Sequence, residues 1–254
     1  MKNLLLLIVI LLLSAGHISH AQQAGLVTSG TVEYTKTINM YALLKPSGDN
    51  VSELAFEQYK QQHSQFASLY SKLSFNRAET LFTPSTAGSL PAGFFAVPQI
   101  ALQNSTIYMD HDNGIYASQK TIFNATYLVK DSIRKIRWKL TEELRDIAGY
   151  NCRRANGITQ DSLYVVAFYT DQIAISGGPE SFTGLPGMIL QLALPHEHIS
   201  WIASKVTVGP VPPTALRQPK NGKLTDLKGL TLRLREISEQ RKEPANVNLK
   251  AFMF

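Results

Sequence analysis

The chain has 254 residues, of which 44% are hydrophobic, and a formal net charge of +6. Its basic residues are scattered rather than gathered in a stripe, which argues against a nucleic-acid-binding surface. Its single cysteine, Cys152, excludes an internal disulfide, so the folded chain must depend on an ordinary hydrophobic core.

The first residues are typical of a secretory signal peptide. Lys2 precedes an apolar block from Leu4 to Leu13, and the small residues Ser19 and Ala21 mark a cleavage site after Ala21. The block is shorter than the ~18 to 20 apolar residues that a spanning helix needs. No cysteine stands at the cleavage site to carry a lipid. We expect an unlipidated periplasmic or extracellular protein, with at most peripheral membrane contact, whose residues 22–254 form one domain.

Two elements are predicted before the first long loop. Residues 30–40 alternate apolar and polar side chains, which predicts a half-buried strand. In residues 49–73, side chains at spacings of four and three form one face of a predicted helix, with Asn50 as its cap. The residues on this face are Ala55, Tyr59, Gln62, Phe66, Leu69 and Leu73.

Residues 83–98, "TPSTAGSLPAGFFAVP", predict a long loop because proline, glycine and small residues dominate them. Such a loop in a compact domain usually has a function of its own. The adjacent Phe94 and Phe95 make this loop a candidate for contacting an apolar ligand.

Short strands with turns between them are predicted over residues 105–170. The turn Asp112–Gly114 is a strong hairpin signal, because Asn and Gly tolerate positive φ. Alternation places Ile136, Trp138 and Leu140 on one inward face. The predicted strands are residues 105–111, 115–123, 126–131, 133–140, 147–157 and 161–170.

The C-terminal third adds two strands and one ambiguous element. Residues 188–194 and 199–208 read as strands joined by a Pro-His-Glu-His turn. The leucines of residues 225–244 alternate as in a strand, but they also keep the spacing of a helix. Thr225 could cap such a helix, and we favour the helix. The predicted fold is mainly β (α+β), a twisted antiparallel sheet or half-open barrel with one early and one late helix.

The segment 177–187, "GGPESFTGLPG", concentrates glycine and proline directly before a strand. These residues permit a tight backbone path, so we expect a rigid loop that Leu185 and Met188 dock onto the sheet. A phosphate-binding loop would need Lys-Ser or Lys-Thr after its last glycine, and Gly-x-Ser-x-Gly occurs nowhere in the chain.

The same segment resembles the GLPGLI family of exported proteins from Gram-negative bacteria over residues 72–208. Met188 stands where the family name has leucine, and Ala174 stands where such proteins tend to have proline. The resemblance implies an envelope protein of unassigned function, with a possible outer-membrane transport partner, and brings no catalytic residues. It is carried by Trp138, Gly149, Tyr150, Cys152, Tyr169, Thr170, Gly178, Pro179 and residues 184–189.

Two other kinds of chemistry remain open alternatives. Imidazole and thioether ligands suit copper, and two spaced pairs, Met109 with His111 and His196 with His198, could supply them. Cys152 could be a nucleophile, although a free cysteine is more often a small core residue.

The leading hypothesis is a non-enzymatic envelope protein, without a resident cofactor, that binds an apolar or peptide partner. The two glycine- and proline-rich loops would form the rim of its curved sheet. The candidate ligand-binding residues are Phe94, Phe95, Leu185, Pro186 and Met188.

Overall fold

The computed structural model describes residues 26–45, 53–85, 90, 99–102, 105–122 and 125–241. The predicted signal peptide and the Phe94–Phe95 segment lie outside the described residues. Among the described residues, no helix is long and apolar enough to cross a membrane.

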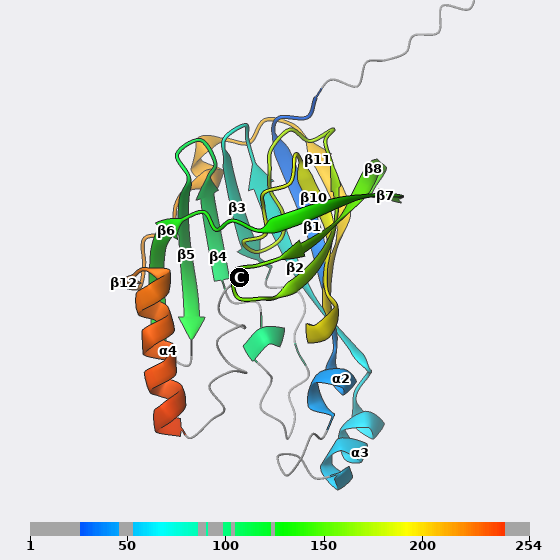
Figure 1. Cartoon of the computed structure of the whole chain (residues 1–254), viewed down its shortest axis with the longest axis vertical. Coiled ribbons are helices and arrows are strands. Elements are labelled where there is room, and N and C mark those ends of the chain that lie inside the picture. The colour runs from blue at the N-terminus through cyan, green and yellow to red at the C-terminus, as the bar shows by residue number, and fades with distance from the viewer. Residues whose placement is uncertain are drawn as a thin grey trace, which may run out of the picture.

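Twelve strands form one curved sheet in the order β12-β6-β5-β4-β3-β2-β1-β11-β10-β9-β8-β7 (Figure 1). Neighbours pair antiparallel except β12, which is parallel to β6. The predicted mainly β class is thereby confirmed. The strands are β1 Gly30–Asn39, β2 Phe66–Phe75, β3 Glu79–Pro84, β4 Ser105–Asp110, β5 Ile115–Ile122, β6 Ala125–Ser132, β7 Arg137–Ile147, β8 Tyr150–Ile158, β9 Tyr164–Thr170, β10 Met188–Leu194, β11 Ile199–Val208 and β12 Lys223–Thr225.

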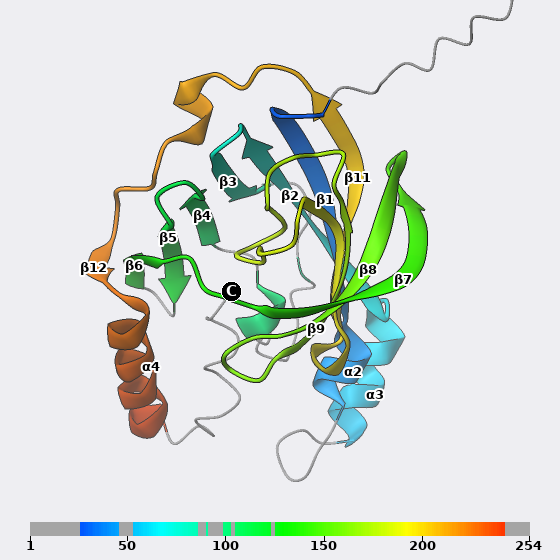
Figure 2. The same cartoon turned by 45° about the horizontal axis from the view of Figure 1, so that its top comes forward.

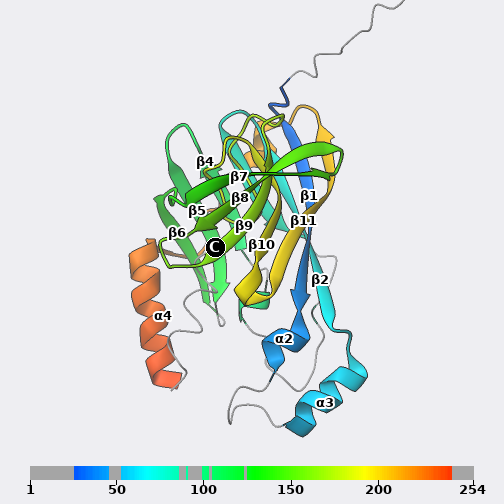
Figure 3. The ribbon, with the colours of Figure 1, turned by 45° about the vertical axis from the view of Figure 1, so that its right-hand side comes forward.

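Short helices flank the sheet. The early helices are α2 (Met40–Leu44) and α3 (Glu53–Gln62), and the late helix is α4 (Leu227–Arg241), which lies beside β6 (Figure 3). The late helix is confirmed, but Asp226 rather than Thr225 caps it, because the Asp226 Oδ1 accepts the Gly229 N–H at 2.6 Å. Single 3₁₀ turns occur at η1 (Gln99–Ala101), η2 (Pro195–Glu197) and η3 (Pro213–Leu216).

The predicted helix over residues 49–73 is wrong in its second half. The helix ends at Gln62, and Phe66–Phe75 forms β2, with every residue paired to β1 from Asn39 back to Gly30. The ten consecutive residue pairs between β2 and β1 decide the structure of this segment, although the spacing of its apolar residues fits a helix. β3, which we did not predict, extends the sheet on the other side of β2.

The predicted inward face of β7 holds only in part. Ile136 and Trp138 pack against the core, but Leu140 is 46% exposed. β7 is the last strand of the sheet, and its pairing with β8 shifts between Leu140 and Leu144, so the simple alternation of faces breaks there.

Candidate functional site

The loop between β9 and β10 lies inside the curl of the sheet (Figure 2). Its backbone takes positive φ at Glu180 (53°), Gly184 (97°) and Gly187 (143°), which fits the tight path expected of a glycine-rich segment. Leu185 and Met188 are buried, as predicted for residues that dock the loop onto the sheet. We call residues 176–187 the motif loop. The motif loop therefore lies within the concave face of the sheet and not at its rim, where we expected it (Figure 2).

Both tryptophans of the chain contact the motif loop. The Trp138 indole N–H donates to the Thr183 carbonyl at 3.0 Å, and the ring of Trp201 lies 6.3 Å from that of Phe182. The Tyr34 hydroxyl donates to the Ile189 carbonyl at 2.6 Å, directly after the loop. The loop is therefore held from several strands at once.

Three charged side chains are buried in the concave face. Lys36 of β1, Lys120 of β5 and Glu180 of the motif loop are 0%, 2% and 3% exposed. Burial lowers the pKa of Lys36 and of Lys120 to about 8, although Glu180 acts in the opposite direction. Burial raises the pKa of Glu180, against the effect of the two lysines. Each charged form is thus less stable in the interior than in water.

Lys36 has defined partners. Its Nζ donates to the carbonyls of Ile100 at 3.3 Å and Leu102 at 2.8 Å, and it lies 5.0 Å from the centre of the Trp201 ring. These contacts attach the segment around η1 to the concave face.

The sequence contained a signal for the buried position of Lys36. Within β1, Val32, Tyr34 and Ile38 alternate on the buried face, and Lys36 falls on the same face. Glu180 gave no such signal, because its inward position depends on the turn of the motif loop.

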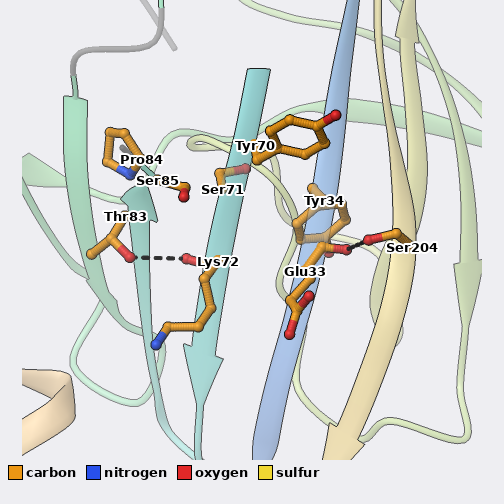
Figure 4. Close-up of a pocket in the computed structure, with 9 residues that line it drawn as sticks. All are labelled: Glu33, Tyr34, Tyr70, Ser71, Lys72, Thr83, Pro84, Ser85 and Ser204. Atoms are coloured by element: carbon orange, nitrogen blue, oxygen red, sulfur yellow. Dashed lines mark hydrogen bonds between the residues drawn. The ribbon is translucent and has the colours of Figure 1, made fainter. Parts of the chain in front are cut away.

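A groove crosses the outer face of β11, β1, β2 and β3, with a volume of about 640 Å³ (Figure 4). Glu33 and Lys72 are directly opposite each other in the ladder, and their side chains both extend along the groove. The Ser204 hydroxyl donates to the Glu33 carbonyl, and the Tyr70 side chain is exposed. The groove is lined by Glu33, Tyr34, Tyr70, Ser71, Lys72, Thr83, Pro84, Ser85 and Ser204.

The predicted ligand-binding residues are not gathered on one surface among the described residues. Leu185 and Met188 are 2% and 0% exposed, whereas Pro186 is exposed. Phe94 and Phe95 lie outside the described residues, so their role stays a prediction.

The two candidate copper pairs lie at opposite ends of the sheet. Ladder pairing through β3 and β2 relates Met109 to Gly30, at the start of β1, whereas the His198 carbonyl accepts the Asn39 N–H at its other end. The described residues contain no group of three or more His, Cys, Asp or Glu side chains that could hold a metal. The candidate copper ligands were Met109, His111, His196 and His198.

Cys152 lies on the buried face of β8, as expected of a free cysteine that is a small core residue. It is fully buried, and this burial, with a smaller effect of Asp146, raises the pKa of its thiol to about 12. Its Sγ–H donates to the Tyr150 carbonyl at 3.4 Å. Because the thiolate is the reactive form, this environment disfavours a nucleophile.

We expect the Cys152 thiol of the folded protein to react with iodoacetamide at least about 100-fold more slowly than that of the chain in denaturant. Mass spectrometry of samples quenched over time measures both rates. The denatured chain is the control for intrinsic reactivity. Equal rates would show an accessible thiol and would revive the cysteine-dependent enzyme hypothesis.

Comparison with known proteins gives one family match and one fold. A family described as a protein of unknown function (Porph_ging) matches residues 156–191. That segment spans β9, the motif loop and the start of β10. No curated protein matches the chain.

Two solved structures of PNGF-II, in C2 and P21 crystal forms, are similar to this chain. They are 16% and 15% identical to it, cover 81% of it, and give TM-scores of 0.49 and 0.50. The chain spans about a third of the length of PNGF-II, since the matches cover 32% and 33% of that protein. At this identity, the likeness concerns the fold alone.

Proposed function

We propose that this chain is an exported binding protein of the cell envelope, of the GLPGLI type, that recognises an extended peptide segment of an envelope partner in the outer groove. The proposal of export rests on the apolar block Leu4–Leu13 and the small residues before position 22. The GLPGLI assignment is supported by "GLPGMI" at residues 184–189, inside the segment that the family of unknown function matches.

The observation that carries the binding role is the outer groove. The groove, about 640 Å³, is larger than the hollows described beside the start of α4 (about 440 Å³) and over β7 to β10 (about 280 Å³). Glu33 and Lys72 present opposite charges side by side, and Tyr70 adds an aromatic ring. An aromatic ring beside paired charges and hydroxyls suits a peptide better than a purely apolar ligand.

Photocrosslinking from position 70 tests this proposal. A chain with a photoreactive phenylalanine analogue in place of Tyr70 is expected to crosslink to one envelope protein in its native host. The same analogue in place of Leu232, exposed on α4, is the matched control. Indistinguishable adducts from the two positions would contradict the proposal.

A synthetic peptide covering the crosslinked segment then gives the binding measurement. Tyr70→Ala is expected to weaken its Kd about tenfold, because exposed aromatic residues are frequent energetic centres of interfaces. The single charge reversal Lys72→Glu is expected to weaken binding of the peptide. The double variant Glu33→Lys, Lys72→Glu exchanges the two charges and is expected to change which charge on the peptide is preferred. A Kd that none of these substitutions changes would place the contact elsewhere.

A further inference from the structure

One row of outward side chains crosses six neighbouring strands of the sheet. Residues that are paired in a ladder have their side chains on the same face, and Tyr70 and Ile202, both in this row, are 43% and 42% exposed. The row therefore runs along the outer face, and it starts in the outer groove. In order, its members are Tyr70 of β2, Thr35 of β1, Ile202 of β11, Gln191 of β10, Phe168 of β9 and Arg154 of β8.

A second hollow, of about 280 Å³, lies at the far end of this row. Phe168 in its lining is only 4% exposed, and the Arg145 guanidinium lies 4.3 Å from the centre of the Phe168 ring. The hollow is slightly smaller than the ~300 to 1,000 Å³ typical of sites for drug-sized molecules, so it suits a single side chain or a chain end. We call it the arginine hollow; it is lined by Glu143, Arg145, Arg154, Val166, Phe168, Gln191, Ala193 and Pro195.

Hydrogen bonds orient both arginines of this hollow. The Arg145 Nη1 donates to the Gln191 Oε1 at 3.2 Å, and the Arg154 Nη1 donates to the Glu143 Oε2 at 2.6 Å. The Arg145 Nη2 also lies 3.5 Å from the other carboxylate oxygen of Glu143. A guanidinium carries five N–H donors in a fixed plane, so it can hold several acceptors at once and matches the geometry of a carboxylate.

The lining of the arginine hollow attracts a negative group. Arg145 and Arg154 are its two positive residues, and Glu143 is its one negative residue. The rest of the lining, apart from Gln191, is apolar. A ligand carboxylate would balance the second arginine through charge-assisted hydrogen bonds, while the carbon chain that bears it packs on the apolar side.

We propose that the arginine hollow binds a carboxylate of the same peptide that occupies the outer groove, so this inference rests on the proposed function. Three to four strand spacings of ~4.8 Å separate Tyr70 from Gln191 and Phe168, which is about 14 to 19 Å. An extended chain advances about 3.3 Å per residue. The carboxylate therefore belongs about four to six residues from the peptide residue that contacts Tyr70. It is an Asp or Glu side chain or the end of the partner's chain.

Photocrosslinking from the arginine hollow tests this inference separately from the proposed function. A photoreactive phenylalanine analogue in place of Ala193 is expected to capture the same envelope protein as the analogue at position 70. Mass spectrometry is expected to place the two crosslinks about four to six residues apart. If position 70 captures a partner and position 193 captures none or another protein, the inference is wrong and the proposed function stands. If position 70 captures nothing specific, both are wrong.

The synthetic peptide that covers the crosslinked segment then tests the role of the charge. Replacing its carboxylate by the matching amide is expected to weaken the Kd about fivefold in the parent protein. In Arg154→Met the same replacement is expected to weaken the Kd by less than about twofold, because the partner of the carboxylate is missing. Arg137→Met, which removes an exposed arginine of β7 outside the hollow, is the matched control and should keep the fivefold effect.

The same peptides identify the source of the carboxylate. An effect of amidating only the chain end indicates a terminal carboxylate, whereas an effect of changing only an acidic side chain indicates an internal one. If the amide peptide binds the parent protein as tightly as the acid does, or loses affinity equally in the parent and in Arg154→Met, the arginine hollow does not bind the carboxylate.

Discussion

Replacing Gly187 by alanine is expected to lower the free energy of unfolding by more than about 3 kcal/mol, enough to leave much of the chain unfolded at 37 °C. A Cβ at this position would lie 2.0 Å from the Thr170 carbonyl oxygen, and the backbone φ of 143° disfavours any side chain. Thr170 cannot withdraw, because it ends β9 and pairs with Met188. Chemical denaturation followed by circular dichroism measures the loss.

Gly209→Ala is the matched control for this substitution. Gly209 follows β11, and no atom lies within 4 Å of a Cβ built there. The free energy of unfolding of the Gly209→Ala variant is expected to differ from that of the parent protein by less than about 0.5 kcal/mol. If Gly187→Ala unfolds like the parent protein, the close approach of the motif loop to β9 does not exist in solution.

The sequence predicted most strands because local alternation and turn residues identify them without tertiary information. The hairpin at Asp112–Gly114 is an example, since Gly114 has the positive φ that its turn requires. The limits of local information show at Phe66 and Leu69, whose spacing of three fits one face of a helix, although the two side chains lie on opposite faces of β2 and Phe66 is 56% exposed. Only the ladder with β1, far away in the chain, decides between helix and strand.

The site was less accessible to sequence reasoning than the fold. Glycine and proline correctly indicated a tight, docked loop, but not which face of the sheet the loop covers. That choice depends on contacts such as Trp138 with Thr183, which join residues distant in sequence. Glu180 was assigned no role from the sequence. Whether a charged residue in a glycine-rich turn is buried or exposed depends on where the turn lies on the sheet.

Alkaline pH is expected to stabilise the protein relative to a variant that lacks the buried charges. Lys36 and Lys120 have folded pKa values of about 8, below their ordinary 10.5. Between these values the unfolded chain binds more protons than the folded one, so stability rises with pH. The slope is at most about 1.4 kcal/mol per pH unit for each lysine. Below pH 8 the two lysines are protonated in both states, so the cost of burying them is constant there. The raised pKa of Glu180 acts in the opposite direction, because above pH 4.5 its contribution to stability falls as pH rises until the folded carboxyl ionises.

The variant Lys36→Met, Glu180→Gln, Lys120→Met removes this cost while keeping side chains of similar size. At pH 7 it is expected to be more stable than the parent by about 1 to 4 kcal/mol, as buried ionic groups replaced by packed neutral ones often are. The advantage should shrink from pH 8 to pH 9.5, measured by urea denaturation.

Cys152, whose raised pKa acts in the opposite direction above pH 9, is common to both proteins and cancels in the difference. The exposed Lys130→Met should show no pH-dependent difference. A constant advantage of the triple variant across this range would mean that water reaches both lysines, and the interior would then not be closed by the motif loop.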